Sequence, residues 1–226
     1  MKLLRDASWW ARDYAYALYW QARAIVGRTP PSTFASGSGT PIVVLPGVYE
    51  TWRFLQPLVT AMHDRGHPVH VIDDLNWNNR PVIEAADRVE RYLVAHELTG
   101  VVLVAHSKGG LIGKYVMTHG EGVARVHSML AVAAPFGGSR YAPFLVLPSL
   151  RIFSPGNAVI RALGLERAVN ARIVSIYGLF DPHVPEGSEL VGAKNVRLAT
   201  GGHFRVLADP RVLAELAVLA EGSPSD

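Results

Sequence analysis

The sequence predicts an α/β domain over residues 41–221, in which a mostly parallel sheet is flanked by helices. Short apolar runs that are typical of buried strands recur along the chain. Segments with helical periodicity separate these runs, and strands joined through helices pair in parallel by right-handed crossovers. The 226 residues, 49% of them hydrophobic, suffice for one domain with a sizeable core.

The expected elements alternate in the order that a parallel sheet requires. The Val101-Val102-Leu103-Val104 run is typical of a buried strand, and proline in its first turn supports a helix over 81–97. Strands are expected at 42–45, 69–72, 101–104, 126–133, 172–177 and 195–199. Helices are expected at 51–64, 81–97, 111–116 and 206–219.

An additional aromatic, amphipathic helix is expected over residues 1–28, ending at Gly27 before Pro30 and Pro31. Its aromatic residues wrap around more than one face: Trp9, Trp10, Tyr14, Tyr16, Tyr19 and Trp20. One interpretation is that this helix packs across the main domain. The other is that residues 1–27 make peripheral contact with a membrane, because aromatic rings with polar tips suit an interface.

Residues 134–170 interrupt the alternation of strands and helices. They carry many apolar side chains, punctuated by Pro143, Pro148 and Pro155. A long apolar excursion between two strands predicts a cap or lid over a binding site, and the alternative is a covering helix that completes the core. Residues 29–40, rich in Pro, Ser and Gly, are expected to form a linker, and residues 222–226 a tail.

Composition narrows the classes of function. The chain has no cysteine, which excludes structural disulfides, Cys-based zinc sites and a thiol nucleophile. A net charge of +3 with scattered basic residues does not indicate a nucleic-acid partner. Polar residues interrupt each apolar run near the N-terminus, so no signal peptide or membrane-spanning helix is recognised. A cytoplasmic location, with membrane association as an option, is the expectation.

The strongest motif is Ala105-His106-Ser107-Lys108-Gly109-Gly110. It follows a predicted strand and precedes a predicted helix, which places Ser107 at a sharp turn. Small residues two before and two after the serine, here Ala105 and Gly109, suit such a cramped turn. The pattern predicts a nucleophilic serine, and the alternative is a serine that caps the helix N-terminus.

A base and an acid are expected to complete the chemistry. A serine hydroxyl needs an imidazole to take its proton, and the imidazole needs a carboxylate to hold its tautomer. Asp181 and His203 each follow a predicted strand. Ligands of parallel sheets bind at the carboxyl ends of the strands, so we predict Asp181 as acid and His203 as base. The alternatives are Glu186 or Glu189 as acid, and His119, His127 or His183 as base.

Two backbone N–H groups are expected to stabilise the oxyanion of acyl transfer. One belongs to Lys108, the residue after the nucleophile, and the other to Val48 in the loop after the first strand. Gly47 allows that loop to turn. The side chain of Lys108 is then expected to be solvated or paired at the surface.

These motifs resemble the α/β-hydrolase superfamily, and within it the bacterial lipase and esterase group. The resemblance rests on Leu45-Pro46-Gly47-Val48, the Ser107 motif, Ala134-Pro135-Phe136-Gly137-Gly138-Ser139, Asp181 and His203. The exit after the strand, Ala134 to Ser139, resembles that of lipases acting on acylglycerols. Ala105 and Lys108 depart from the family pattern, which often has Gly and a bulky neutral residue. The N-terminal helix lies outside the resemblance.

The resemblance implies a serine hydrolase that cleaves carboxylic esters, of lipid or other acyl type, through an acyl-enzyme and without metal or cofactor. Four residues near the predicted site are expected to bind substrate: Tyr49, Phe136, Phe144 and Leu147. The same three catalytic residues would serve an acyltransferase, a thioesterase or an amidase. The alternative from another class is a non-catalytic lipid-binding or membrane-associated module.

Overall fold

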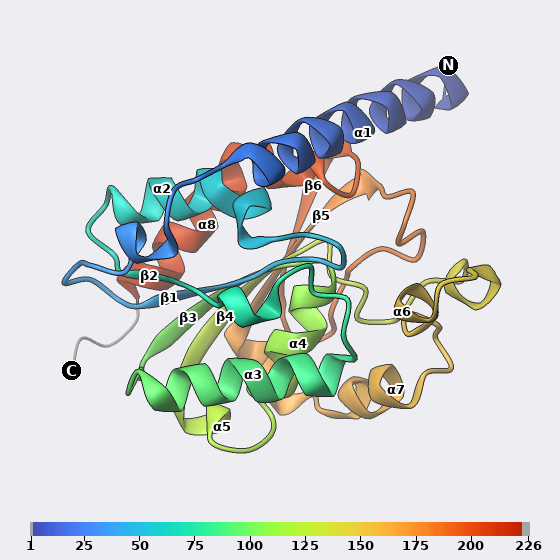
Figure 1. Cartoon of the computed structure of the whole chain (residues 1–226). Coiled ribbons are helices and arrows are strands. Elements are labelled where there is room, and N and C mark those ends of the chain that lie inside the picture. Colours follow the sequence, from blue (N-terminus) through green and yellow to red (C-terminus); the bar gives the residue numbers. More distant parts are fainter. Residues whose placement is uncertain (1, 223–226) are drawn as a thin grey trace.

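Six parallel strands form one sheet in the order β2-β1-β3-β4-β5-β6 (Figure 1). The computed structural model describes residues 2–222, so residues 223–226 of the expected tail lie outside it. The strands are β1 (Ile42–Leu45), β2 (Val69–Val71), β3 (Val101–His106), β4 (Val126–Val132), β5 (Ile173–Phe180) and β6 (Lys194–Gly201). The predicted mostly parallel sheet is confirmed, and the ends of its strands differ from the expected ones by a few residues at most.

Helices cover both faces of this sheet (Figure 1). One layer contains α1 (Lys2–Val26), α2 (Gln56–His63) and α8 (Pro210–Glu221). The other contains α3 (Val82–Ala95), α4 (Lys108–Val116), α5 (Gly122–Arg125) and α7 (Ala158–Leu165), while the short α6 (Pro148–Arg151) stands beyond the carboxyl ends of the strands. Six 3-10 helices are described: η1 (Pro31–Phe34), η2 (Trp52–Leu55), η3 (Asp73–Leu75), η4 (Ala142–Phe144), η5 (Ala168–Arg172) and η6 (Arg205–Ala208).

The pleat of the strands divides the core into two apolar layers. Val43 and Leu45 of β1 pack toward α3 and α4, whereas Ile42 and Val44 pack toward α2 and α8. Successive side chains of a strand point to opposite faces, so a strand covered on both faces is apolar throughout. This explains why the strand at 101–104 lacks polar alternation.

Two predicted helices are each divided into a 3-10 helix and an α-helix. The segment predicted at 51–64 forms η2 followed by α2, with Pro57 in the first turn of α2. The segment predicted at 206–219 forms η6 followed by α8. Asp209 between them is extended, with φ −70° and ψ 129°, because the residue before a proline disfavours the helical region.

Helix α1 packs across the domain along part of its length. It lies against η2, β6 and η6, and Tyr16 and Trp20 join the apolar layer on that side of the sheet. Its N-terminal turns extend past the domain (Figure 1). Within the predicted linker, Phe34 is buried edge-on against Trp52, with 5.8 Å between ring centroids. No helix in residues 2–222 has the length and apolar character needed to cross a membrane.

The segment at 134–170 divides into two parts with different surroundings. Its later part forms α7, whose Ile160 and Leu163 complete the core beside α4. Its earlier part, with η4 and α6, projects beyond the carboxyl ends of the strands (Figure 1). This earlier part is called the cap segment below and comprises residues 139–153.

Candidate functional site

Ser107 occupies a strained turn between β3 and α4. Its backbone has φ 50° and ψ −117°, a combination that residues other than glycine rarely adopt. Glycines two and three residues later let the turn close: a Cβ on Gly109 would overlap the carbonyl oxygen of Leu45, and one on Gly110 would overlap Ala134. The cramped turn expected from the motif is therefore present.

His203 connects Ser107 to Asp181 through hydrogen bonds. Nε2 of His203 lies 2.9 Å from Oγ of Ser107, and its Nδ1 lies 2.8 Å from Oδ2 of Asp181. The other carboxylate oxygen of Asp181 accepts the backbone N–H groups of His183 and Val184 at 2.7 and 2.9 Å. All three side chains are buried, although they come from the ends of β3, β5 and β6.

The electrostatics of the pair suit proton transfer. Burial alone would lower the pKa of His203, but the charge and hydrogen bond of Asp181 outweigh it, and Asp13 and Glu50 add to the effect. The pKa of His203 is therefore raised above its ordinary value. Burial alone would raise the pKa of Asp181, yet the charge of His203 and three hydrogen bonds hold it below its ordinary value.

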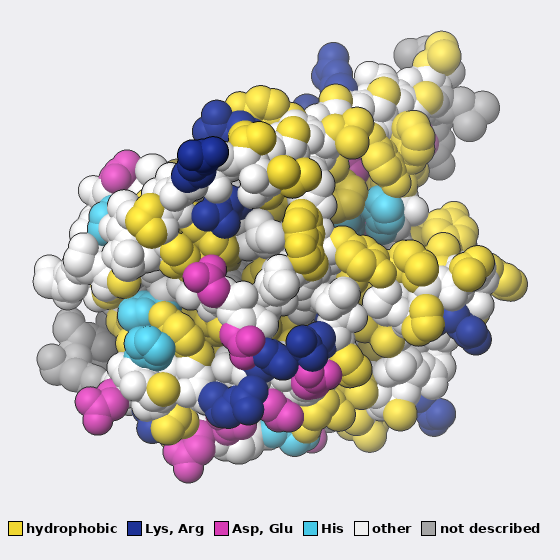
Figure 2. All heavy atoms as spheres, viewed as in Figure 1, with side chains coloured by type: hydrophobic (Ala, Val, Ile, Leu, Met, Phe, Trp, Pro, Cys, Tyr) yellow, Lys and Arg dark blue, Asp and Glu magenta, His cyan; other side chains and the backbone are white. Residues whose placement is uncertain are grey.

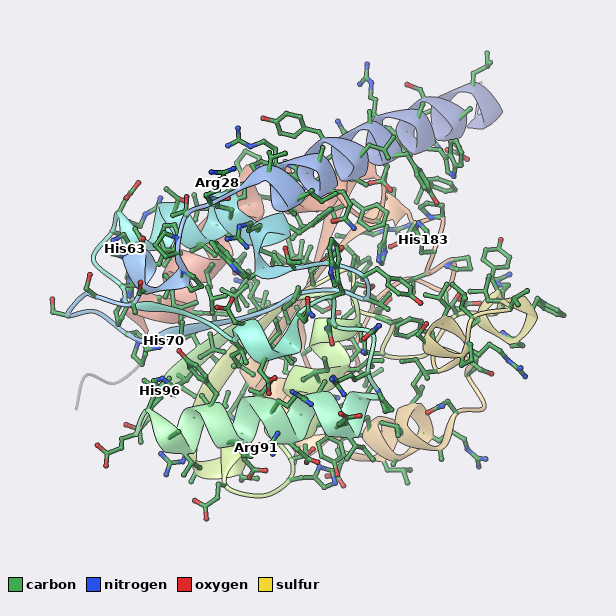
Figure 3. All side chains as sticks on the ribbon, viewed as in Figure 1. Arg28, His63, His70, Arg91, His96 and His183 are labelled. Atoms are coloured by element: carbon green, nitrogen blue, oxygen red, sulfur yellow. The ribbon has the colours of Figure 1, made fainter. Side chains whose placement is uncertain are left out.

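In the described part of the chain, none of the alternative acids and bases is hydrogen-bonded to Ser107 or to the side chain of His203. Glu186 pairs with Arg140 at 2.6 Å and does not contact His203, while Glu189 is not among the partners of His203. His119 stacks on Tyr115, and His127 is not a hydrogen-bond partner of Ser107. His183 lies beside the site, with its ring 4.9 Å from that of His203 and its Nε2 3.0 Å from the Tyr14 hydroxyl of α1. Figure 3 shows His183 near α1.

The predicted oxyanion donors, the N–H groups of Val48 and Lys108, have no hydrogen-bond acceptor within residues 2–222. The neighbouring N–H of Gly47 instead donates to Oε2 of Glu50 at 2.7 Å. The same Glu50 oxygen lies 2.9 Å from Nδ1 of His106. His106 thus contacts the loop that carries Val48 through Glu50.

The expectation for the Lys108 side chain is wrong. It is 0% exposed, and its Nζ donates to the carbonyl oxygens of Asn78 and Arg80 and to Oδ1 of Asn78. The amide of Asn78 donates in turn to the carbonyl of Pro46 at 2.6 Å. Burial lowers the pKa of Lys108 to about 8, with partial compensation by the charge of Glu84. The chain before α3 covers the start of α4. Three oxygens of this chain, two of Asn78 and one of Arg80, accept hydrogen bonds from the Lys108 ammonium group.

A mostly apolar cavity of about 580 Å³ opens beside Ser107 and His203. One wall is the cap segment, with Tyr141, Leu145, Leu150 and Phe153. Another part of the wall is α1, which contributes Tyr14, Ala17, Leu18 and Gln21. Figure 2 shows hydrophobic side chains gathered over the cap segment and along α1.

Of the four predicted substrate-binding residues, Tyr49 lines this cavity. Phe136 packs in the core, with its ring 5.9 Å from Nζ of Lys114. Phe144, which is 85% exposed, and Leu147 face solvent and do not line the cavity. The α1 wall was missed, although its lining positions 14, 17, 18 and 21 show the spacing of one helix face.

No group of three or more His, Asp or Glu side chains in the described part of the chain could hold a metal ion. The chemistry available at this site is that of a serine, an imidazole and a carboxylate beside an apolar cavity.

Comparison with known proteins finds likeness in structure. No family model matches the chain, and no curated protein sequence matches it. Among solved structures it is similar to an extracellular α/β-hydrolase from a Paenibacillus species, with TM-score 0.55, 17% identity, and 80% of this chain and 98% of that one covered. It is also similar to lipase B from Aspergillus fumigatus, with TM-score 0.66, 20% identity, and 88% and 57% covered.

A third similar structure is a monoacylglycerol lipase from Paleococcus ferrophilus, with TM-score 0.62, 15% identity, and 84% and 97% of the two chains covered. The chain therefore has the α/β-hydrolase fold, as the resemblance implied. At these identities the likeness extends to the fold, and the activity must be argued from the site.

Proposed function

We propose that this protein is a serine hydrolase that cleaves carboxylic esters carrying an acyl chain. The observation that carries the proposal is the hydrogen-bonded series from Ser107 through His203 to Asp181 at the wall of an apolar cavity. Such a series is the arrangement that turns a weak hydroxyl nucleophile into an effective one. Two of the similar structures are named as lipases, which agrees with this chemistry.

In the proposed first half-reaction, Oγ of Ser107 attacks the ester carbonyl carbon while Nε2 of His203 takes its proton. Asp181 stabilises the imidazolium that forms. The tetrahedral intermediate collapses when its bond to the alcohol oxygen breaks, and His203 gives its proton to that oxygen. The alcohol leaves and the acyl group remains on Ser107.

The second half-reaction releases the acid. A water molecule attacks the acyl carbon, His203 takes its proton, and the ester bond to Ser107 breaks as the proton returns to Oγ. In both half-reactions the oxyanion accepts hydrogen bonds from the backbone N–H groups of Val48 and Lys108. These two N–H groups have no other acceptor in the described part of the chain. Loss of one such donor typically costs about 3 to 4 kcal/mol of transition-state stabilisation.

The proposed substrate class follows from the cavity. Its walls are mainly aliphatic and aromatic, and they include Leu18 of α1 and Leu145, Leu150 and Phe153 of the cap segment. An acyl chain placed there buries apolar surface at about 25 cal/mol per Å². Esters with a chain long enough to fill this space should therefore have higher kcat/KM than acetate esters.

The test is a chain-length series of chromogenic esters with the wild type and Ser107→Ala. We expect the substitution to lower turnover by about a million-fold, as in other serine hydrolases. A fluorophosphonate should label the wild type alone. Undiminished hydrolysis by Ser107→Ala would overturn the proposal. Partition of the acyl group between water and an added alcohol or thiol distinguishes a hydrolase from an acyltransferase.

We also propose that the cap segment contacts a lipid surface, on which an acyl ester would be found. Phe144 and Val146 are 85% and 91% exposed beside the cavity. Wild-type protein should float with phospholipid vesicles, and the variant with both Phe144→Ser and Val146→Ser should not. Leu165→Ser, at an exposed leucine of α7, is the matched control and should float. Failure of the wild type to float would contradict the contact.

A further inference from the structure

The loop that carries His203 is held by a side chain from α1. Asp13 is 0% exposed, and its carboxylate accepts three consecutive backbone N–H groups. Oδ2 accepts from His203 at 2.8 Å, and Oδ1 accepts from Phe204 at 2.8 Å and from Arg205 at 2.7 Å. These N–H groups stand at the start of η6, where a helix leaves its first donors without partners.

Two glycines make this contact possible. A Cβ on Gly202, whose φ is 127°, would overlap Oδ1 of Asp13. A Cβ on Gly201 would overlap the ring of Trp9 one turn earlier on α1. The Gly201-Gly202 pair directly before His203 therefore lets α1 approach the loop closely enough for the carboxylate to reach its N–H groups.

The backbone of His203 is thereby fixed on both sides. Its N–H donates to Asp13, and its carbonyl oxygen lies 3.1 Å from Nε2 of His106. Asp181 fixes the imidazole itself at Nδ1. These three contacts fix the loop that carries His203. The position of this loop in turn sets the 2.9 Å distance between Nε2 of His203 and Oγ of Ser107.

We propose that Asp13 is a positioning residue for acyl transfer, which holds His203 in reach of Ser107 and adds negative charge beside the imidazolium that forms. The proposal rests on the proposed esterase function. Asp13 contacts backbone N–H groups and not the imidazole, so it acts through His203 and takes part in no proton transfer. This role of Asp13 makes α1 part of the catalytic unit, although α1 lies outside the motifs that resemble the hydrolases.

The charge of Asp13 is one of several near His203. The titratable and polar groups around His203 come from the elements packed against it. They are Asp181 and His183 in the loop after β5, Ser107 and His106 at the end of β3, Glu50 in the loop after β1, and Tyr14 and Asp13 on α1. Burial lowers the pKa of His203, and the negative charges of Asp181, Asp13 and Glu50 act to raise it. Removal of the Asp13 charge should therefore lower that pKa.

The test is Asp13→Asn, which keeps the shape of the side chain but removes its charge and one acceptor. We expect kcat to fall by about 100-fold, the loss typical of a catalytic group displaced by about 1 Å, with KM little changed because the cavity walls stay. The acidic limb of kcat/KM should move to lower pH. Asp6→Asn on the same helix, at a carboxylate that pairs with Arg5, is the control and should match the wild type.

A second measurement does not depend on hydrolysis. The titration of the His203 imidazole is followed by nitrogen NMR in a Ser107→Ala background, with and without Asp13→Asn, after circular dichroism has established that both fold. A lower titration midpoint in the protein that carries Asp13→Asn than in its Ser107→Ala parent supports the proposal. An unchanged midpoint with unchanged kcat overturns it. A wild type that neither hydrolyses esters nor reacts with a fluorophosphonate overturns the proposed function, while the titration still decides whether the charge of Asp13 acts on His203.

Discussion

Nε2 of His106 lies 3.1 Å from the backbone carbonyl oxygen of His203, and the opposite nitrogen of the same ring lies 2.9 Å from Glu50. Glu50 also accepts the N–H of Gly47 at 2.7 Å. One buried pair of side chains therefore joins the loop that carries the proposed oxyanion donor Val48 to the loop that carries the proposed base. The two loops are therefore connected through His106, which contacts Glu50 of the first loop and the backbone of His203 in the second.

Substitution of Glu50 should therefore lower activity through geometry. Glu50→Gln removes the charge that faces His106 and offers its Gly47 partner a weaker acceptor. We expect kcat for a chromogenic ester to fall by about 10- to 100-fold, as for other losses of alignment. Glu97→Gln, at an exposed glutamate, should leave kcat at the wild-type value. Equal kcat for Glu50→Gln and wild type would show that the pair has no role in aligning the loops.

The tight turn after Ser107 predicts a large difference between two glycine substitutions. Gly109→Ala places a Cβ against the carbonyl of Leu45 and should lower the free energy of unfolding by about 3 kcal/mol. Gly137→Ala, at an exposed glycine with open space around its Cβ position, should change it by less than about 0.5 kcal/mol. Urea denaturation measures both, and similar values for the two variants would contradict the described geometry.

The pH dependence of activity should follow His203. The base must be unprotonated to accept the Ser107 proton, and its pKa is raised, despite burial, by Asp181. The logarithm of kcat/KM should therefore rise with pH to a midpoint above the ordinary histidine value of about 6.5. His183 does not contribute between pH 5 and 8, because burial and the charge of His203 lower its pKa to about 4.

Asp181→Asn tests this assignment. The substitution should move the acidic midpoint to lower pH and reduce kcat by about 10⁴-fold, since the imidazole loses both its charge partner and its tautomer. A midpoint that stays in place would show that a group other than His203 controls the acidic limb.

Lys108→Met should destabilise the fold without a change in volume. Three oxygens of Asn78 and Arg80 lose their donor, and buried acceptors without a partner cost about 1 to 3 kcal/mol each. The chosen measurement is the free energy of unfolding by urea. Lys114→Met is the control for loss of a buried lysine, because the Nζ of Lys114 faces the ring of Phe136.

The effect of Lys108→Met should also grow with pH. Burial lowers the folded-state pKa of Lys108 to about 8, below the unfolded value, so above pH 8 the unfolded chain binds more protons than the folded one. Wild-type stability therefore gains from this group as pH rises through 8, and Lys108→Met lacks the gain. The stability gap between the two proteins should widen between pH 7 and 10, and a constant gap would contradict the lowered pKa.

The sequence predicts the convergence of Ser107, Asp181 and His203 because each follows a strand, and parallel strands end at the same edge of a sheet. Asp13 could not be predicted in this way. It lies on a helix outside the motifs, and its partners are backbone N–H groups, which leave no pattern of side chains in the sequence.

Two other side chains lie where the sequence did not lead us to expect them, for local reasons. Lysine is almost always exposed, so the burial of Lys108 depends on carbonyls of the chain before α3 that no motif reveals. Phe144 is apolar and close to the site in sequence, but η4 turns its first residue, Ala142, inward and leaves Phe144 outside. Apolar character alone does not tell which side of a short turn faces a cavity.

The contact of Asp13 with residues 203–205 also bears on how the protein folds. The hydrogen bond to His203 spans 190 positions of the chain, whereas the turn at Ser107 is built from β3, α4 and strands next to β3. Closing so long a loop carries a large entropic cost, and contacts of high sequence separation form slowly. During refolding, the nucleophile should therefore reach its native setting before the base does, and ester hydrolysis should recover later than the secondary structure.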